Sequence, residues 1–277
     1  MRHAILLLLF GLTLAFAGCA SLLQSPAERA DALARGAGFV PQPAGRFVRI
    51  YLKAPPGHME ALTVYIEGDG ARWRAANLPP ADPTPENPLS LRLAIQDPGP
   101  AVAYIGRPCQ YLDEDALGDC DPALWTRGRY SEAALKIMGD ALDTVVRTTG
   151  ARQLTLIGHS GGGAMAALLA ERRRDVACLA SVAAPLDIAA WTAAIGVSPL
   201  RTSINPFDGA ARLIKVPQVH FTGAKDDVVP PATIARFLKA LPQAREVRIE
   251  KFDHDCCWVD EWVKLRARAC TPAVGGP

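Results

Sequence analysis

A single serine lies in a glycine-rich turn that separates two apolar segments. Residues 154–157 are apolar and β-prone, residues 158–162 read Gly-His-Ser-Gly-Gly, and the Ala/Leu-rich residues 164–171 have helical character. A serine hydroxyl becomes a useful nucleophile when a base removes its proton and a carboxylate orients that base. Flanking glycines suit a strained turn that neighbouring chain segments approach closely. Ser160 is therefore the candidate nucleophile, and an ordinary glycine-rich connection is the alternative.

This Gly-x-Ser-x-Gly turn between strand and helix resembles the nucleophile elbow of the α/β-hydrolase superfamily. In that family the acid and the histidine follow the serine in this order. Residues 220–231 resemble the family's acid loop, in which the carboxylate falls three residues after a glycine and a Val/Pro pair follows. The resemblance implies that Asp226 is the acid. Asp227 is its main rival, and either side chain could instead be a turn residue or a helix cap.

The family's histidine follows the last strand, and here residues 252–258 read Phe-Asp-His-Asp-Cys-Cys-Trp. The resemblance therefore implies that His254 is the base, although a lone histidine can also be structural. The other histidines fit worse, because they lie in the signal segment, in a turn, beside the serine and inside a strand: His3, His58, His159 and His220.

Backbone N–H groups must hold the oxyanion of a tetrahedral intermediate. Gly161 directly follows the serine and is one donor by the geometry of the elbow. In the family the other comes from the loop after the strand at 62–66, where many relatives carry His-Gly and this chain has Glu-Gly-Asp. Because main-chain groups make these contacts, Asp69 is the expected second donor. The alternative is a Gly-rich turn with no catalytic duty.

Two further motifs resemble a poorly described group of bacterial envelope α/β-hydrolases: Gly-Asp-Gly-x-x-Trp at 68–73 and Arg-Pro-Cys-Gln-Tyr at 107–111. The loop 107–128 leaves the carboxyl end of a strand, so we expect it over the face where open sheets bind ligands. Residues 191–208 are a candidate for the opposite wall of the pocket. Three aromatic side chains could line that pocket or pack in the core: Trp73, Tyr111 and Trp125.

Apolar strands alternate with helical patterns along the rest of the chain. We expect strands at 47–52 (an edge strand), 62–66, 101–105, 176–183, 216–222 and 246–251, and helices at 89–95, 130–148, 233–241 and 258–269. Near-continuous apolar strands are typical of a sheet covered on both faces, and their alternation with helices implies a mainly parallel sheet. The predicted architecture is an α/β-hydrolase fold with helices on both faces, in a single domain at 41–277.

Composition limits the classes of partner. The chain has 277 residues, of which 49% are hydrophobic and 21% charged, so it can bury a large core. A net charge of +2 is too small to favour a nucleic acid, and we expect no nucleic-acid partner. The sequence has no CxxC pair and no clustered histidines, so we predict no metal site and no cofactor.

The first residues resemble an export signal. Arg2 and His3 precede an apolar run at 4–17, which is too short to span a bilayer as a mature helix. Residues 16–19, Phe-Ala-Gly-Cys, resemble the lipobox of bacterial lipoproteins, with Phe16 in place of the usual Leu. In that family the chain is cut before the cysteine, which then carries the lipid.

The lipoprotein resemblance implies a signal peptide at 1–18, a lipid on Cys19, and a tether or short helix at 19–40. Ala20 rather than Asp after the cysteine resembles lipoproteins that are sent to the outer membrane. We therefore expect a bacterial envelope protein that is anchored to the outer membrane and faces the periplasm. A plain signal peptide with an incidental cysteine is the alternative.

An exported chain meets an oxidising compartment, where disulfides persist. Six cysteines remain besides Cys19, and sequence alone does not choose among their pairings: Cys109, Cys120, Cys178, Cys256, Cys257 and Cys270. Cys257 and Cys270 flank a helical pattern that would hold them roughly 20 Å apart, beyond the reach of a disulfide. Cys109–Cys120 closes a short loop and is the first choice.

These expectations together favour a serine hydrolase that cleaves an ester or related acyl bond without a metal or cofactor. The substrate would be a small-molecule or lipid-like acyl compound. A peptidase or an acyltransferase using the same three side chains is one alternative. A second alternative is an envelope binding protein that keeps the fold but has no catalytic turnover. The presence of the serine, the acid and the histidine together disfavours this alternative.

Overall fold

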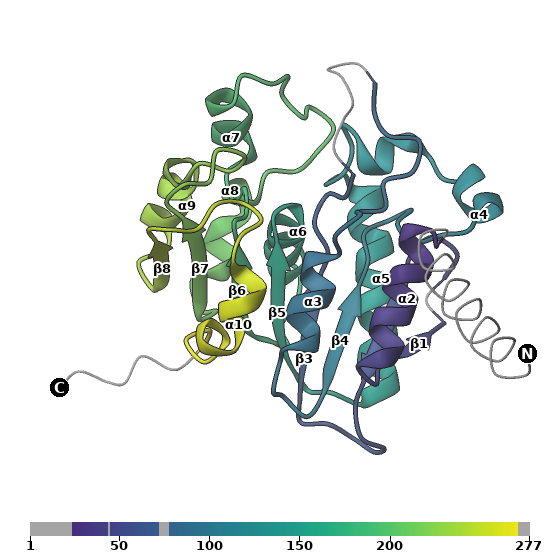
Figure 1. Cartoon of the computed structure of the whole chain (residues 1–277). Coiled ribbons are helices and arrows are strands. Elements are labelled where there is room, and N and C mark those ends of the chain that lie inside the picture. The colour runs from purple at the N-terminus through teal and green to yellow at the C-terminus, as the bar shows by residue number, and fades with distance from the viewer. Residues whose placement is uncertain (1–23, 44, 72–77, 271–277) are drawn as a thin grey trace, which may run out of the picture.

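A computed structural model describes residues 24–43, 45–71 and 78–270 (Figure 1). The predicted signal peptide, Cys19 and Trp73 lie outside the described residues. Within the described ranges, none of the helices combines the length and the apolar character needed to cross a membrane.

An eight-stranded sheet forms the centre of the described chain, in the order β1-β2-β4-β3-β5-β6-β7-β8. The strands are β1 (Val40–Gln42), β2 (Ile50–Lys53), β3 (Ala61–Ile66), β4 (Val102–Ile105), β5 (Gln153–His159), β6 (Val176–Val182), β7 (Gln218–Gly223) and β8 (Ala244–Ile249). Only the pairs β1–β2 and β2–β4 are antiparallel. The predicted mainly parallel α/β sheet is therefore confirmed.

Helices cover both faces of this sheet (Figure 1). One face carries α2 (Pro26–Gly36), α3 (Leu89–Ile95) and α10 (Trp258–Arg266). The other carries α5 (Glu132–Thr149), α6 (Gly161–Ala170) and α9 (Ala235–Ala240). Each layer buries its own apolar cluster, and burial of apolar surface is the main force that holds such layers together.

Shorter helices lie in the connections. These are α4 (Glu114–Gly118), α7 (Ile188–Ala194), α8 (Pro206–Gly209) and the 3₁₀ turns Pro122–Trp125, Ala210–Leu213 and Pro231–Ile234. The loop expected at 107–128 thus holds one helix and one 3₁₀ turn. The helix expected at 233–241 is preceded by a 3₁₀ turn that begins at Pro231. A proline is tolerated in a first turn because the N–H group that it lacks would have no partner within the helix there.

Local sequence explains the ends of α5. The Ser131 side chain accepts a hydrogen bond from the N–H of Ala134, which caps the first turn. The helix ends at Gly150, whose left-handed conformation (φ 64°) suits glycine. The helix predicted at 130–148 is therefore confirmed to within two residues at its start and one at its end.

The prediction of an edge strand at 47–52 is wrong. The short strand β1 pairs outside β2 and forms the edge, while β2 is buried at Ile50, Tyr51 and Leu52. The helix expected within 19–40 is α2, which a Ser25–Glu28 capping box begins and which buries Ala30 and Ala34. The folded unit therefore includes α2 as well as β1.

Six cysteines form three disulfides in the described chain. Cys109–Cys120 is the predicted pair, with Cα atoms 6.1 Å apart. Cys178 on β6 bonds Cys270 after α10, with Cα atoms 5.8 Å apart, and so ties the C-terminal helix to the sheet. The neighbours Cys256 and Cys257 bond each other beside His254. The pair Cys257–Cys270, which the sequence argument excluded, does not form.

Candidate active site

Ser160 stands at a tight turn between β5 and α6. Its backbone has φ 52° and ψ −129°, a conformation that is rare and strained for a residue with a side chain. A Cβ atom on Gly158 would lie 2.2 Å from the backbone of Gly162, and one on Gly162 would lie 2.2 Å from the Ile66 carbonyl oxygen, so the turn packs this closely only because both positions are glycine. The strand–turn–helix unit predicted from the sequence thus presents the serine hydroxyl at its apex.

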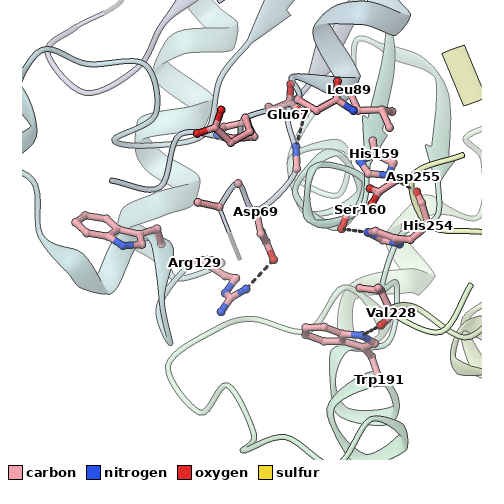
Figure 2. A pocket seen from close by; sticks show the side chains of 17 residues that line it. Glu67, Asp69, Leu89, Arg129, His159, Ser160, Trp191, Val228, His254 and Asp255 are labelled. Carbon is pink, nitrogen blue, oxygen red and sulfur yellow. Dashed lines mark hydrogen bonds and ion pairs between the residues drawn. The ribbon is translucent and has the colours of Figure 1, made fainter. Parts of the chain in front are cut away.

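The structure brings Ser160, His254 and Asp226 into one hydrogen-bonded chain, of which Figure 2 shows the bond between Ser160 and His254. The serine Oγ lies 3.0 Å from His254 Nε2, to which it can donate its proton. His254 Nδ1 lies 2.9 Å from Asp226 Oδ2. The other carboxylate oxygen of Asp226 accepts from the N–H groups of Val228 (3.0 Å) and Val229 (2.7 Å). These two bonds fix the Asp226 carboxylate, whose other oxygen then orients the imidazole ring of His254.

The rivals considered from sequence lie elsewhere. Asp227 is exposed, whereas Asp226 is only 4% exposed. His58 is exposed, and His220 is buried in β7 with its Nδ1 2.8 Å from Ser181 Oγ. His159 is buried beside His254 with ring centroids 5.0 Å apart, but its Nε2 bonds to the His254 carbonyl oxygen and not to Asp226.

The backbone of His254 is fixed by two ring donors. Trp258 Nε1 donates to the His254 carbonyl at 3.1 Å, and His159 Nε2 lies 3.0 Å from the same oxygen. Because a carbonyl oxygen can only accept, His159 must carry its proton on Nε2. Burial, and then the neighbouring His254, lowers the pKa of His159 to about 3, so this ring stays neutral at physiological pH.

The two oxyanion donors predicted from the sequence, the N–H groups of Gly161 and Asp69, belong to segments next to Ser160: Gly161 follows it in the chain, and Gly68 approaches it in space. Gly161 opens α6, and the first N–H groups of a helix have no partner within it. In the loop after β3, Glu67 Oε1 accepts the Gly68 N–H at 2.9 Å, and the Pro83 carbonyl accepts the Ala71 N–H at 3.0 Å. In the chain, the N–H groups of Asp69 and Gly70 lie between these two occupied donors, and the oxyanion role of Asp69 stays a prediction. Gly68 packs against Ser160 and brings the loop to the serine.

A sequence model of a serine hydrolase family, FSH1, matches residues 102–255, which is more than half of the chain. The chain belongs to the FSH1 serine hydrolase family. The matched segment includes Ser160, Asp226 and His254. No curated protein matches the chain.

Solved structures show the same fold in distant proteins. Est1E from Butyrivibrio proteoclasticus superposes with a TM-score of 0.58 at 14% identity, over 83% of this chain and 98% of its own. An α/β serine hydrolase homologue from Coxiella burnetii gives 0.54 at 16% identity, over 83% and 94%. The acylaminoacyl peptidase of Pyrococcus horikoshii gives 0.62 at 11% identity, over 86% of this chain but 43% of its own. The predicted α/β-hydrolase fold is confirmed.

The serine of this FSH1 hydrolase opens into a cavity of about 570 Å³. Among the described residues, its large apolar lining side chains come from four chain regions: Leu89, Trp125, Trp191 and Val228. The expectation for Trp125 is confirmed, while Tyr111 lies buried in the core against Tyr104 instead. Trp191 places part of the segment 191–208 at the opposite wall, where its Nε1 donates to the Val228 carbonyl (Figure 2).

The polar lining includes a residue that the sequence argument missed. Arg129 faces the cavity and its Nη1 lies 2.9 Å from Asp69 Oδ2. The chain around it, Arg-Gly-Arg-Tyr, carries no pattern that distinguishes this arginine from its neighbour Arg127. Glu67 also lines the cavity; its burial raises the pKa of the carboxyl group although Gly68, Ser90 and Tyr104 donate to it.

Ligand atoms of His159, His254 and Asp255 lie within 4.8 Å of one another, the spacing of a group that could hold a metal ion. Both ring nitrogens of His254 already make hydrogen bonds, to Asp226 and Ser160, and His159 Nε2 is bonded to a carbonyl. A metal here would have to displace the serine from His254. The arrangement of these groups suits proton transfer from Ser160.

Proposed function

We propose that this family member hydrolyses acyl esters through Ser160, His254 and Asp226. The observation that carries the proposal is the unbroken hydrogen-bonded chain from Asp226 through His254 to the Ser160 hydroxyl, with Ser160 and His254 lining a cavity of about 570 Å³. Nucleophile, base, orienting carboxylate and oxyanion donors are the groups that acyl transfer requires.

In the proposed mechanism, Ser160 Oγ attacks the acyl carbon while its proton passes to His254 Nε2. The carbonyl oxygen becomes an oxyanion that accepts from the N–H groups of Gly161 and Asp69. Asp226 holds the imidazole and stabilises its positive charge. The tetrahedral intermediate then collapses, and the alkoxide leaving group takes the proton from His254. Water repeats the sequence on the acyl-enzyme and releases the acid.

The cavity favours an acyl chain of moderate size. Trp125, Trp191 and Leu89 give apolar surface on more than one side of Ser160, which suits burial of a hydrocarbon chain. A peptidase on the same groups is the second candidate, because one structural neighbour is an acylaminoacyl peptidase.

We also propose that the protein is exported and anchored through a lipid on Cys19, facing the periplasm from the outer membrane. The lipobox-like residues 16–19 support this. The pairing of all six cysteines among the described residues also supports it, because such disulfides persist in oxidising compartments.

A fluorophosphonate probe followed by an acyl-ester series tests the activity. The wild type should be labelled and should hydrolyse p-nitrophenyl esters with an optimum at one chain length. Ser160→Ala should lose both properties, and the exposed Ser198→Ala should keep both. Equal labelling of wild type and Ser160→Ala would refute the nucleophile. Labelling without ester turnover, together with cleavage of acyl-peptides, would favour the peptidase.

Fractionation of the expressing cells tests the anchor. The wild type should partition with the outer membrane, whereas Cys19→Ser should appear in the soluble periplasmic fraction. A Cys19→Ser protein that stays in the membrane would contradict the anchor.

A further inference from the structure

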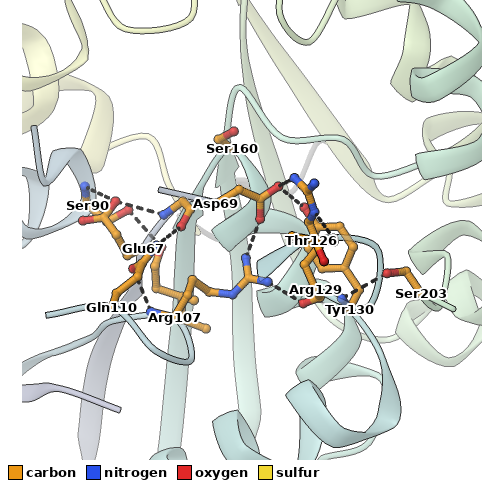
Figure 3. A network of polar contacts seen from close by, with 12 residues as sticks. Glu67, Asp69, Ser90, Arg107, Gln110, Thr126, Arg129, Tyr130, Ser160 and Ser203 are labelled. Atoms are coloured by element: carbon orange, nitrogen blue, oxygen red, sulfur yellow. Dashed lines mark hydrogen bonds and ion pairs between the residues drawn. The ribbon is translucent and has the colours of Figure 1, made fainter. Parts of the chain in front are cut away.

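The loop that carries the proposed Asp69 donor is held by the side chain of the same residue. Arg107 Nη1 donates to Asp69 Oδ1 at 2.9 Å, and Arg129 Nη1 donates to Oδ2 at 2.9 Å (Figure 3). The Tyr130 hydroxyl donates to Oδ2 at 2.8 Å. Three donors from two distant chain segments thus converge on one carboxylate. We call Asp69, Arg107, Arg129 and Tyr130 the carboxylate clamp.

The clamped carboxylate lies against the other proposed donor. A Cβ atom on Gly161 would lie 1.9 Å from Asp69 Oδ1 and 2.6 Å from the Tyr130 hydroxyl. A negative charge at this place would oppose the negative charge of an oxyanion held by Gly161. The two guanidinium groups offset it, because they give the clamp a net charge of +1.

Asp69 is ionised in this setting. Burial would raise the pKa of its carboxyl group, but the charges of Arg129 and Arg107 and the hydrogen bonds from Arg129 and Tyr130 hold it below the ordinary value of 3.8. The clamp is therefore an ion-pair cluster at neutral pH. Its orientation is fixed by directed hydrogen bonds, which are stronger when both partners are charged.

The preceding residues of the loop are fixed from the other side. Gln110 Nε2 donates to the Gly68 carbonyl at 3.0 Å, and Gln110 Oε1 accepts the Arg107 N–H at 3.0 Å. Glu67 Oε1 accepts the Gly68 N–H. The segment 107–111 therefore grips the loop at Gly68 through Gln110 and at Asp69 through Arg107 (Figure 3). This contact gives the motifs at 68–73 and 107–111 a shared physical purpose.

We propose that Arg107 and Arg129 are positioning residues for the oxyanion hole: they clamp the Asp69 side chain so that its backbone N–H faces Ser160, and they cancel the charge of its carboxylate. This inference rests on the proposed acyl transfer at Ser160. Arg107 is 3% exposed, and its Nη2 also donates to the Arg129 carbonyl at 2.6 Å, so it braces the clamp from within. Arg129 closes the clamp from the cavity side.

The decisive variant is Arg129→Gln, with Arg127→Gln as its matched control. Arg127 lies two residues away and is exposed, so its replacement removes the same charge outside the clamp. Arg129→Gln should lower kcat about 10- to 100-fold and change KM less than about threefold, since only the transition state carries the oxyanion. Arg129→Lys should recover part of the loss, and Arg127→Gln should match the wild type.

A double-mutant cycle with Asp69→Asn shows whether Arg129 acts through the carboxylate. In the Asp69→Asn background the clamp has no charge to compensate, so Arg129→Gln should cost less than about threefold. An equal loss in both backgrounds would overturn the proposal. A raised KM with unchanged kcat would also overturn it, because Arg129 would then bind substrate in the ground state.

An alkyl trifluoromethyl ketone supplies a separate readout, because it adds to the serine and leaves an oxyanion. Its Ki should rise in Arg129→Gln by the same factor as KM/kcat, while binding of the corresponding methyl ketone stays unchanged. Tyr130→Phe removes one donor at nearly constant volume and should lower kcat about 3- to 10-fold, which gives a second test if Arg129→Gln folds poorly. Unaltered kcat in folded Tyr130→Phe and Arg129→Gln would refute the clamp.

These experiments distinguish a failure of the proposed ester hydrolysis from a failure of the clamp's proposed role. If the wild type shows no Ser160-dependent turnover, the proposed function and the clamp's role both fall. If the wild type turns over and Arg129→Gln behaves like Arg127→Gln, only the clamp's role falls.

Discussion

Ser160 lies between two loops that are fixed by different kinds of interaction. On one side, the Asp69 loop is held by ion pairs to Arg107 and Arg129. On the other, the His254 loop is held largely by neutral donors, the Trp258 ring and His159. The proposed mechanism accounts for this difference. A loop that must receive negative charge gains from nearby cations, whereas a base that becomes positive needs a single, well-oriented carboxylate.

Loss of the charged hydrogen bond between Asp226 and His254 should give the largest fall in kcat. Asp226→Asn keeps the shape of the side chain but removes the charge that holds the imidazole, so kcat should fall about 10³- to 10⁴-fold. The exposed neighbour Asp227→Asn is the control and should leave kcat unchanged in ester assays. An active Asp226→Asn with an inactive Asp227→Asn would transfer the acid role to Asp227.

The Asp69 loop packs against Gly161, where the next largest effect is expected. An added Cβ atom would lie 1.9 Å from Asp69 Oδ1, so Gly161→Ala must push the clamp away from Ser160. We expect kcat to fall about 100-fold, the order of loss for a displaced oxyanion donor. Gly139→Ala is the control, because its nearest neighbour would be Leu169 at 4.0 Å. Near-wild-type kcat in Gly161→Ala would mean that the carboxylate can move freely.

The loop that follows Arg107, which holds the Asp69 loop, is closed by the disulfide Cys109–Cys120. Chain entropy predicts that a loop of this length is worth about 3 kcal/mol, so the double variant Cys109→Ser/Cys120→Ser should lower the free energy of unfolding by about that amount. Urea unfolding with the other two disulfides intact measures it. The arginine pairs should still hold the Asp69 loop in the folded state, so kcat should change less than stability. A loss of kcat without a loss of stability would contradict this division.

A second carboxylate shows what the clamp accomplishes. The side chain of Glu171 is 3% exposed, and its ion-pair partner is Arg212 at 3.6 Å, whose side chain is exposed. Burial raises the pKa of Glu171 to about 7, whereas the paired arginines lower that of Asp69. The side chain of Asp69 is 21% exposed and that of Glu171 3%, and the close guanidinium groups of Arg107 and Arg129 account for the lowered pKa of Asp69.

Glu171 therefore makes stability depend on pH. Its folded pKa lies above the ordinary value of 4.5, so the stability it contributes is complete below that value and is lost as the pH rises through about 7. Glu171→Gln should stabilise the protein at pH 8 by about 2 kcal/mol and have little effect at pH 4.5. Urea unfolding at both pH values measures this, with the exposed Glu250→Gln as the control. Equal effects at the two pH values would contradict the raised pKa.

Sequence alone determined the parallel part of the sheet, the elbow at Ser160 and the order of acid and histidine. These features are local: apolar strands, a glycine-bounded turn and loop residues at strand ends each carry their signal within a few positions. The outermost strand was misassigned because the burial of β2 depends on β1, whose three residues give no periodic pattern.

Only the tertiary structure shows that Asp226 rather than Asp227 contacts His254, since both lie in the same turn and just one is buried against that ring. The cysteine pairs other than Cys109–Cys120 also needed the fold, because Cys178 and Cys270 are 92 residues apart in the chain. The carboxylate clamp also needed the tertiary structure. Asp69, Arg107 and Arg129 come from separate loops, and a sequence shows which charged residues are present but not which of them form ion pairs in the folded protein.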